Sequence, residues 1–264
     1  DLHLLSRRQR QMCIRDRDNS ASGLFLDMGM GKTVSTLTAI DDLILLGEVN
    51  KVLVIAPLRV AEDTWSTEVD KWDHLKHLRI SKILGSKKQR EEAINTEADI
   101  YVTNRENVDW LVTECFNSWI WDMVVIDELS SFKSSKAKRF RALKKVRPHF
   151  KRIVGLTGTP APNSLIDLWP QIYLLDGGQR LGKTITGYKE RYFKPGRRNG
   201  YVVYNWELKE GSEEAIQNKI SDICISMSAK DYLDIPERID NRVEITLPIK
   251  AMDCLLYTSP SPRD

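Results

Sequence analysis

One segment near the start of the chain has the residue types that bind phosphate groups. Residues 26–33 read LDMGMGKT; they follow a short apolar run and open a stretch with apolar residues at helical spacing. Glycines let backbone N–H groups close around phosphate oxygens, and a helix N-terminus favours negative charge. Lys32 would reach the β- and γ-phosphates, and the Thr33 hydroxyl would bind magnesium. The predicted nucleotide-binding residues are Asp27, Met28, Gly29, Met30, Gly31, Lys32 and Thr33.

A second segment matches the strict phosphate-loop pattern but lacks its context. Residues 177–184 read GGQRLGKT and satisfy GxxxxGK[ST] at every position, whereas Leu26 stands where the first segment should have glycine. No apolar strand ending in a paired Asp-Glu follows Gly177, and one does follow Lys32. We therefore place the site at Lys32 and interpret residues 177–184 as an ordinary helix start.

Two adjacent carboxylates end the apolar run at residues 123–126. A parallel strand would bring Asp127 and Glu128 to the carboxyl edge of a sheet, where ligands bind in such folds. Asp127 would hold the magnesium shell, and Glu128 would polarise the attacking water as general base. A small-molecule kinase needs no such base, so the pair favours ATP hydrolysis; solvated acids at a strand end are the alternative. The predicted catalytic residues are Lys32, Asp127 and Glu128, with Thr33 and Asp127 on Mg²⁺.

Strands and helices must alternate to position these residues. Strands are expected at residues 23–26, 51–56, 78–84, 100–103, 123–126 and 153–156, and helices at 33–46, 62–72, 90–96, 108–115, 136–146 and 164–175. This alternation predicts an α/β fold with a parallel, doubly wound sheet over roughly residues 20–175. Beyond it the alternation fails, and residues 201–204 and 242–247 are expected strands of a small mixed α/β appendage.

Composition narrows the class of protein. The 264 residues carry a formal net charge of +3, with 41% hydrophobic and 29% charged residues, which suits a folded chain. No apolar run approaches the roughly 20 residues that cross a bilayer, so no membrane partner is expected. The cysteines, Cys13, Cys115, Cys224 and Cys254, show no CxxC spacing, which argues against zinc and disulfides and favours a reducing cytoplasm. Residues 133–152 have no acidic residue; they could meet phosphates or form a solvated helix face.

The two ends do not share the pattern of their neighbours. Residues 1–17 and 254–264 resemble peptides that arise when sequencing-adaptor DNA is translated. The alternative is a real basic arm and a real Ser/Pro tail. We expect an ATP-binding lobe at residues 18–175, an appendage at 176–253, and a natural protein that is longer at both ends.

Together these motifs resemble the Swi/Snf group of superfamily-two helicase-like ATPases, most closely the versions carried by phages and prophages. The resemblance covers roughly residues 20–250. Residues 26–33 resemble motif I, and residues 127–130 resemble motif II. Motif Ia is resembled by residues 56–58 together with Trp65, Glu68, Lys71 and Trp72, and the next nucleic-acid-facing segment by residues 102–106. Motif III is resembled by residues 156–160 together with Asn163, Leu168 and Trp169.

The resemblance implies two RecA-like lobes that grip duplex DNA, with ATP between them, and translocation without full strand separation in a bacterial or phage-infected cell. It assigns coupling of hydrolysis to DNA contact to Thr157, Gly158 and Thr159, and contact with the DNA backbone to Pro57, Arg59, Thr103 and Asn104. A turn after a strand and loop residues that end strands are the respective alternatives.

The sequence also departs from the family pattern. Ser130 stands where many relatives carry His, which leaves the coupling route open, and the adenine-reading motif should lie upstream of Asp18. The second lobe with its arginine fingers is missing from this chain, so we expect weak nucleotide binding and slow hydrolysis. Other hypotheses are a strand-separating helicase, the motor subunit of a restriction system, and a non-catalytic nucleotide-binding scaffold.

Overall fold

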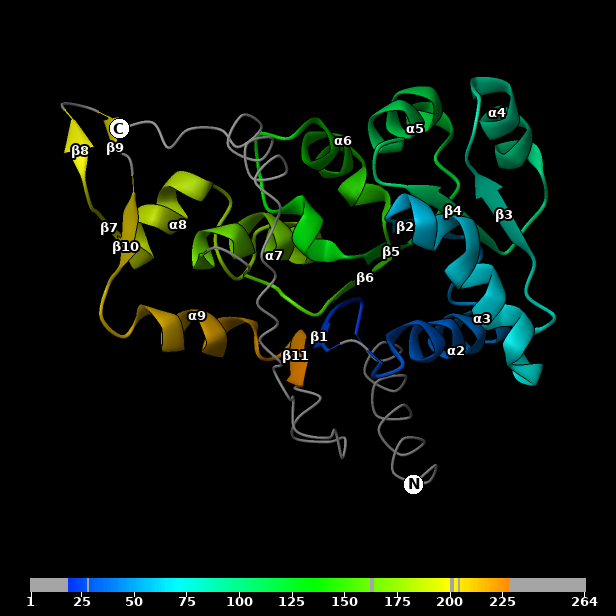
Figure 1. The fold of residues 1–264 in the computed structure, drawn as a ribbon, viewed down its shortest axis with the longest axis horizontal. Helices are drawn as coiled ribbons and strands as arrows, with labels where there is room; N and C mark the ends of the chain where they lie inside the picture. The colour runs from blue at the N-terminus through cyan, green and yellow to red at the C-terminus, as the bar shows by residue number, and fades with distance from the viewer. Residues whose placement is uncertain (1–18, 28, 162–163, 200–201, 204, 228–264) are drawn as a thin grey trace, which may run out of the picture. The chain divides into compact units, whose positions relative to one another are not determined.

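The computed structural model describes residues 19–27, 29–161, 164–199, 202–203 and 205–227. Met28, Asn163, the two terminal segments expected to be foreign, and the expected strand at residues 242–247 lie outside the described residues. Among the described residues, a seven-stranded parallel sheet has the strand order β11-β1-β6-β5-β2-β4-β3 (Figure 1). Its strands are β1 (Ala21–Leu26), β2 (Val52–Ala56), β3 (Ile80–Ile83), β4 (Ile100–Asn104), β5 (Met123–Asp127), β6 (Arg152–Thr157) and β11 (Cys224–Met227).

Helices cover both faces of the sheet. Helices α2 and α3 lie on one face, and α5, α6 and α7 pack together on the other (Figure 1). Strands β1, β2 and β4 are buried along their whole length, as expected for a sheet covered on both sides. The helices are α2 (Lys32–Leu45), α3 (Trp65–Lys71), α4 (Lys87–Asn95), α5 (Val108–Cys115), α6 (Lys138–Val146), α7 (Leu168–Asp176), α8 (Ile185–Tyr192) and α9 (Ser212–Ile220). The predicted parallel α/β fold is therefore confirmed.

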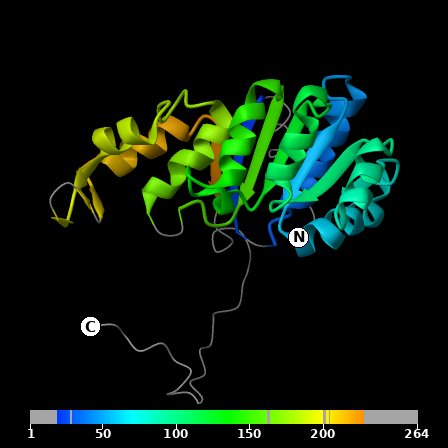
Figure 2. The same cartoon turned by 90° about the horizontal axis from the view of Figure 1, so that it is seen from above.

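The edge strand β11 corrects the expected extent of the sheet. It comes from beyond residue 175 and pairs in parallel with β1, with Gly23 opposite Cys224. A Cβ atom at Gly23 would lie 2.8 Å from the Cys224 sulfur, so only glycine permits this close approach. Figure 1 and Figure 2 show α8 and α9 on the side of the sheet where β11 lies. Side chains of both helices, among them Tyr188 and Ile216, belong to the main core cluster.

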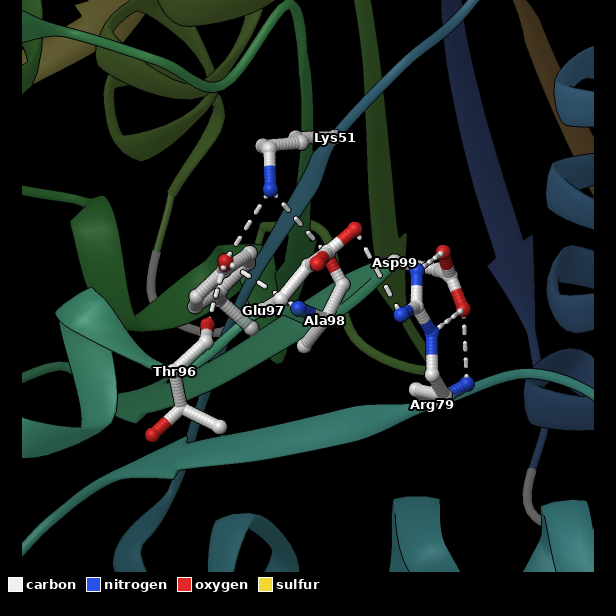
Figure 3. A network of polar contacts seen from close by, with 7 residues as sticks. Lys51, Arg79, Thr96, Glu97, Ala98 and Asp99 are labelled. Atoms are coloured by element: carbon white, nitrogen blue, oxygen red, sulfur yellow. Dashed lines mark hydrogen bonds and ion pairs between the residues drawn. The ribbon is translucent and has the colours of Figure 1, made fainter.

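The amino edge of the sheet is tied together by polar contacts that involve none of the predicted site residues (Figure 3). Arg79 donates from Nη2 to Asp99 Oδ1 at 2.9 Å and from Nε to Asp99 Oδ2 at 3.1 Å. The buried Tyr101 hydroxyl donates to Thr96 O at 2.8 Å and accepts from Lys51 Nζ at 3.2 Å. These contacts fix the starts of β2, β3 and β4, so the opposite edge can carry irregular loops.

Candidate nucleotide-binding site

The loop between β1 and α2 has the backbone form of a phosphate cradle. Gly29 and Gly31 have φ angles of 79° and 73°, in the left-handed region that favours glycine. Its two chain neighbours aside, no atom of the described residues lies within 4 Å of the position that a Cβ of Gly29 would take, so a ligand can approach the backbone there. Helix α2 begins at Lys32, and the N–H groups of its first turn have no helical acceptor. Thr33 lies in that turn, and the neighbouring Met30 is buried.

Lys32 lies where the loop and the acidic pair meet. Its ammonium group donates to the carbonyl oxygens of Leu26 at 2.5 Å and Asp27 at 3.1 Å. Burial lowers the pKa of Lys32, while the charges of Asp127, Glu128 and Asp27 act in the opposite direction. The structure thus brings together the lysine and the carboxylates that the sequence paired across about a hundred residues.

Asp127 is positioned by a tryptophan of the core. The indole Nε1 of Trp65 donates to Asp127 Oδ2 at 3.2 Å, and the Trp65 side chain has 0% exposure. Burial raises the pKa of Asp127, whereas the bond from Trp65 and the charge of Lys32 lower it. Trp65 belongs to the segment that resembles motif Ia, and its contact with Asp127 was not expected from the sequence. The strand order could have indicated this contact, because Trp65 follows β2, and β2 pairs with β5, the strand that ends at Asp127.

Glu128 turns the chain sharply after β5. It has φ 59° and ψ 61°, and among the described residues it is the one non-glycine with positive φ. Its Oε1 accepts hydrogen bonds from the Thr157 hydroxyl at 2.9 Å and from the Ser130 hydroxyl. A left-handed conformation is strained for glutamate, and such strain concentrates at functional sites.

The predicted coupling segment lies between the phosphate loop and the acidic pair. Strand β6 runs between β1 and β5, so its carboxyl end, Thr157, lies beside both. The Thr159 N–H donates to Thr157 Oγ1 at 3.2 Å. A Cβ atom at Gly158 would lie 3.3 Å from Leu26 O, which shows how closely this turn approaches the loop. Thr157, Gly158 and Thr159 therefore have the placement that the coupling hypothesis requires.

The four residues expected to contact DNA differ in exposure. Pro57 and Arg59 follow β2, and the Arg59 side chain is exposed. Thr103 has 0% exposure, and its hydroxyl donates to Ile83 O at 3.0 Å. Asn104 is 8% exposed and donates from Nδ2 to Glu106 Oε2 at 3.1 Å. A buried hydroxyl does not face a DNA backbone, so Thr103 fits the alternative interpretation as a residue that ends a strand.

Residues 177–184, which match the strict pattern, do not form a phosphate loop. They connect α7 to α8 and do not follow a strand. Thr184 is the N-cap of α8, and its hydroxyl accepts from the Gly187 N–H at 3.2 Å. The prediction of an ordinary helix start is confirmed.

A basic groove opens beside Glu128. It has a volume of about 410 Å³ and is lined by Arg105, Glu128, Ser130, Ser131, Lys133 and Arg139. Helix α6, from the basic stretch at residues 133–152, buries Phe140, Leu143 and Val146 and exposes most of its basic residues. The basic stretch is therefore partly a solvated helix face and partly the rim of this groove.

The donor set fits a nucleotide-bound magnesium ion rather than a metal cage. In the described part of the chain, no group of three or more His, Cys, Asp or Glu side chains could hold a metal. Mg²⁺ usually takes one or two protein oxygens and completes its shell with water and phosphate, which the Thr33 hydroxyl and the Asp127 carboxylate could match. None of the helices in the described residues is long and apolar enough to span a membrane.

Comparisons with known proteins identify the family and the fold of the chain. The model of the SNF2-related domain matches residues 6–225. The match includes residues 6–17, whose structure is not described, so their foreign origin stays a prediction. A putative protein p41 of Acyrthosiphon pisum secondary endosymbiont phage 1 is 40% identical over 241 residues, covering 89% of this chain and 52% of the relative. The human DNA excision repair protein ERCC-6-like is 30% identical over 188 residues, covering 68% of this chain and 15% of the relative.

Two solved structures share the fold. The Sulfolobus solfataricus SWI2/SNF2 ATPase core in complex with dsDNA has a TM-score of 0.68 at 24% identity, covering 87% of this chain and 45% of that one. The ATPase core domain from the same organism has a TM-score of 0.64 at 24% identity and covers 98% of this chain and 52% of that one. The chain spans about half the length of the phage relative and of both structures. It belongs to the SNF2-related family of helicase-like ATPases, and its sheet is a RecA-like ATPase lobe.

Proposed function

We propose that this chain is the ATP-binding lobe of a DNA-dependent ATPase that uses ATP hydrolysis to move along duplex DNA. The observation that carries the proposal is the convergence of Lys32, Asp127 and Glu128 at the carboxyl edge of the sheet. Membership of the SNF2-related family supports it. Such chemistry requires Thr33 in addition to these three residues, and all four are present. Their presence argues against a non-catalytic scaffold.

Each residue has a distinct role in this proposal. Lys32 and the N–H groups of residues 27–33 hold the ATP phosphates, and Thr33 and Asp127 hold Mg²⁺. The magnesium ion would neutralise charge on the phosphate oxygens. Glu128 takes a proton from the attacking water, and the turn that contains Thr157 senses whether DNA is bound.

We propose two partners for this lobe, DNA and a second lobe of the same protein. Arg59 and Pro57 are the proposed contacts with the DNA backbone, since Arg59 is exposed after β2. The chain spans about half of its phage relative, so we propose that the whole protein contains a second RecA-like lobe with arginine fingers. The lobe described here would then hydrolyse ATP slowly by itself.

The test is ATP hydrolysis by the full-length protein with and without duplex DNA. We expect DNA to stimulate turnover, and Glu128→Gln to abolish turnover while ATP binding is retained, because the amide cannot accept the proton from water. Failure to separate a forked duplex would exclude the strand-separating helicase. Turnover that ignores DNA, or a Glu128→Gln variant as active as wild type, would contradict the proposal.

A further inference from the structure

Two hydroxyl groups from different parts of the chain bind the same oxygen of Glu128. Ser130 lies two residues further along the same turn, and Thr157 ends the neighbouring strand β6; both donate to Glu128 Oε1. The Thr159 N–H in turn donates to Thr157 Oγ1, which orients that hydroxyl toward the carboxylate. Both bonds engage Oε1, so within the described part of the chain the second carboxylate oxygen, Oε2, stays available to a water molecule.

The backbone of the turn is held by packing against the same strand. Leu129 has 0% exposure, and a Cβ atom at Gly155 would lie 2.6 Å from Leu129 Cδ2. Gly155 and Thr157 are two residues apart on β6, so they face the same side of the sheet. In strand β6, Gly155 therefore leaves space for the Leu129 side chain, and Thr157, two residues further along, donates a hydrogen bond to Glu128. This packing explains how the strained conformation of Glu128 is maintained.

We propose that Ser130 is a positioning residue that orients Glu128 as the general base, an inference that rests on the proposed function. A single bond from Thr157 leaves the carboxylate free to rotate about that contact, and a second bond from Ser130 removes this freedom. Ser130 comes from the turn of Glu128 itself, so its contact does not depend on β6. The orientation of Glu128 then has one fixed donor, Ser130, and one donor that responds to the coupling segment, Thr157.

The structure offers matched variants for a test in the full-length protein. Ser130→Thr and Ser130→Val have nearly the same shape and differ in the hydroxyl group. Ser131→Ala is the control, because it removes a hydroxyl from the same turn and Ser131 Oγ has no hydrogen-bond partner among the described residues. For each variant we would measure kcat and KM for DNA-stimulated ATP hydrolysis, the Kd for MgATP and the Tm.

We expect Ser130→Val and Ser130→Ala to lower kcat by about tenfold, because a lost hydrogen bond to a charged group changes a barrier by this order. KM and the Kd for MgATP should stay within about twofold of wild type, since the phosphates do not contact Ser130 in the proposed site. Ser130→Thr should restore most of kcat, and Ser131→Ala should match wild type.

Equal kcat values for Ser130→Thr and Ser130→Val would overturn the inference. A kcat that falls only in those variants whose Tm also falls would overturn it as well, because the loss would then reflect stability. The Glu128→Gln variant separates this failure from failure of the proposed function. If Glu128→Gln abolishes turnover but the Ser130 variants do not change it, only the positioning role of Ser130 is wrong. If Glu128→Gln is fully active, the proposed function itself is wrong.

Discussion

The side chain of Asp127 lies between a tryptophan of the core and the lysine of the phosphate loop. Trp65 binds one carboxylate oxygen, and the charge of Lys32 acts on the same group. Burial works against the ionised form that Mg²⁺ requires, and both neighbours counteract it. The position of a proposed metal ligand thus depends on a tryptophan whose contact with the site was not expected from the sequence.

Replacing Trp65 by Phe should therefore affect the chemistry more than the fold. Phenylalanine keeps most of the packing and removes the indole N–H, so the Mg²⁺ concentration for half-maximal ATP hydrolysis should rise by about three- to tenfold. Trp72→Phe is the matched control, because the indole of Trp72 donates to Glu68 Oε2 at 2.9 Å instead. A magnesium titration of both variants checks this prediction. An equal magnesium requirement for both would contradict it.

At the scale of elements, one carboxylate joins the starts of three strands at the amino edge of the sheet. Asp122, just before β5, accepts from the N–H groups of Asn50 and Lys51 and from Lys151 Nζ, each at 3.1 Å. It joins the starts of β2, β5 and β6. Burial raises the pKa of Asp122, but the hydrogen bonds from Lys51, Asn50 and Lys151 outweigh burial and hold it below its ordinary value.

A lowered pKa has a defined effect on stability. The stabilisation by Asp122 is fully present above the unfolded-state pKa of about 4 and is lost as the pH falls through the lower pKa of the folded state. Asp122→Asn should reduce the free energy of unfolding at pH 7 by about 1–2 kcal/mol. The side-chain amide of asparagine would place its own N–H donors beside the N–H groups of Asn50 and Lys51 and the ammonium group of Lys151, which are donors as well.

The difference from wild type should shrink below about pH 4. Urea unfolding at several pH values measures it, with the exposed Asp73→Asn as control. A difference that does not change with pH would contradict this assignment.

The elements differ in how far the sequence predicts them. Strands such as β2 and β5 are continuous apolar runs because helices cover both faces of the sheet, so the pattern finds them. Strand β11 has four residues, most of them half-buried, and its sequence CISM gives no periodic signal. The left-handed conformation of Glu128 could not be predicted either. It depends on the packing of Leu129 against Gly155 and on hydrogen bonds from the Ser130 and Thr157 hydroxyls, which only the folded chain brings together.

At the scale of the whole molecule, three segments distant in sequence meet at one edge of the sheet. The order β1-β6-β5 places the phosphate loop, the coupling turn and the acidic pair side by side. This order also explains why residues 177–184, which follow a helix, cannot substitute for the loop at Lys32. We propose that a second lobe completes the site across this edge in the whole protein.

The central claim is that ATP binds at Lys32 and not at the segment that satisfies the strict pattern. Lys32 and Lys183 occupy the same position in their two GKT sequences, which makes Lys32→Ala and Lys183→Ala a matched pair. The most direct measurement is DNA-stimulated ATP hydrolysis by both variants of the full-length protein. The structure predicts that Lys32→Ala loses activity by at least about a hundredfold while Lys183→Ala retains it. Full activity of Lys32→Ala, or loss only in Lys183→Ala, would contradict the claim.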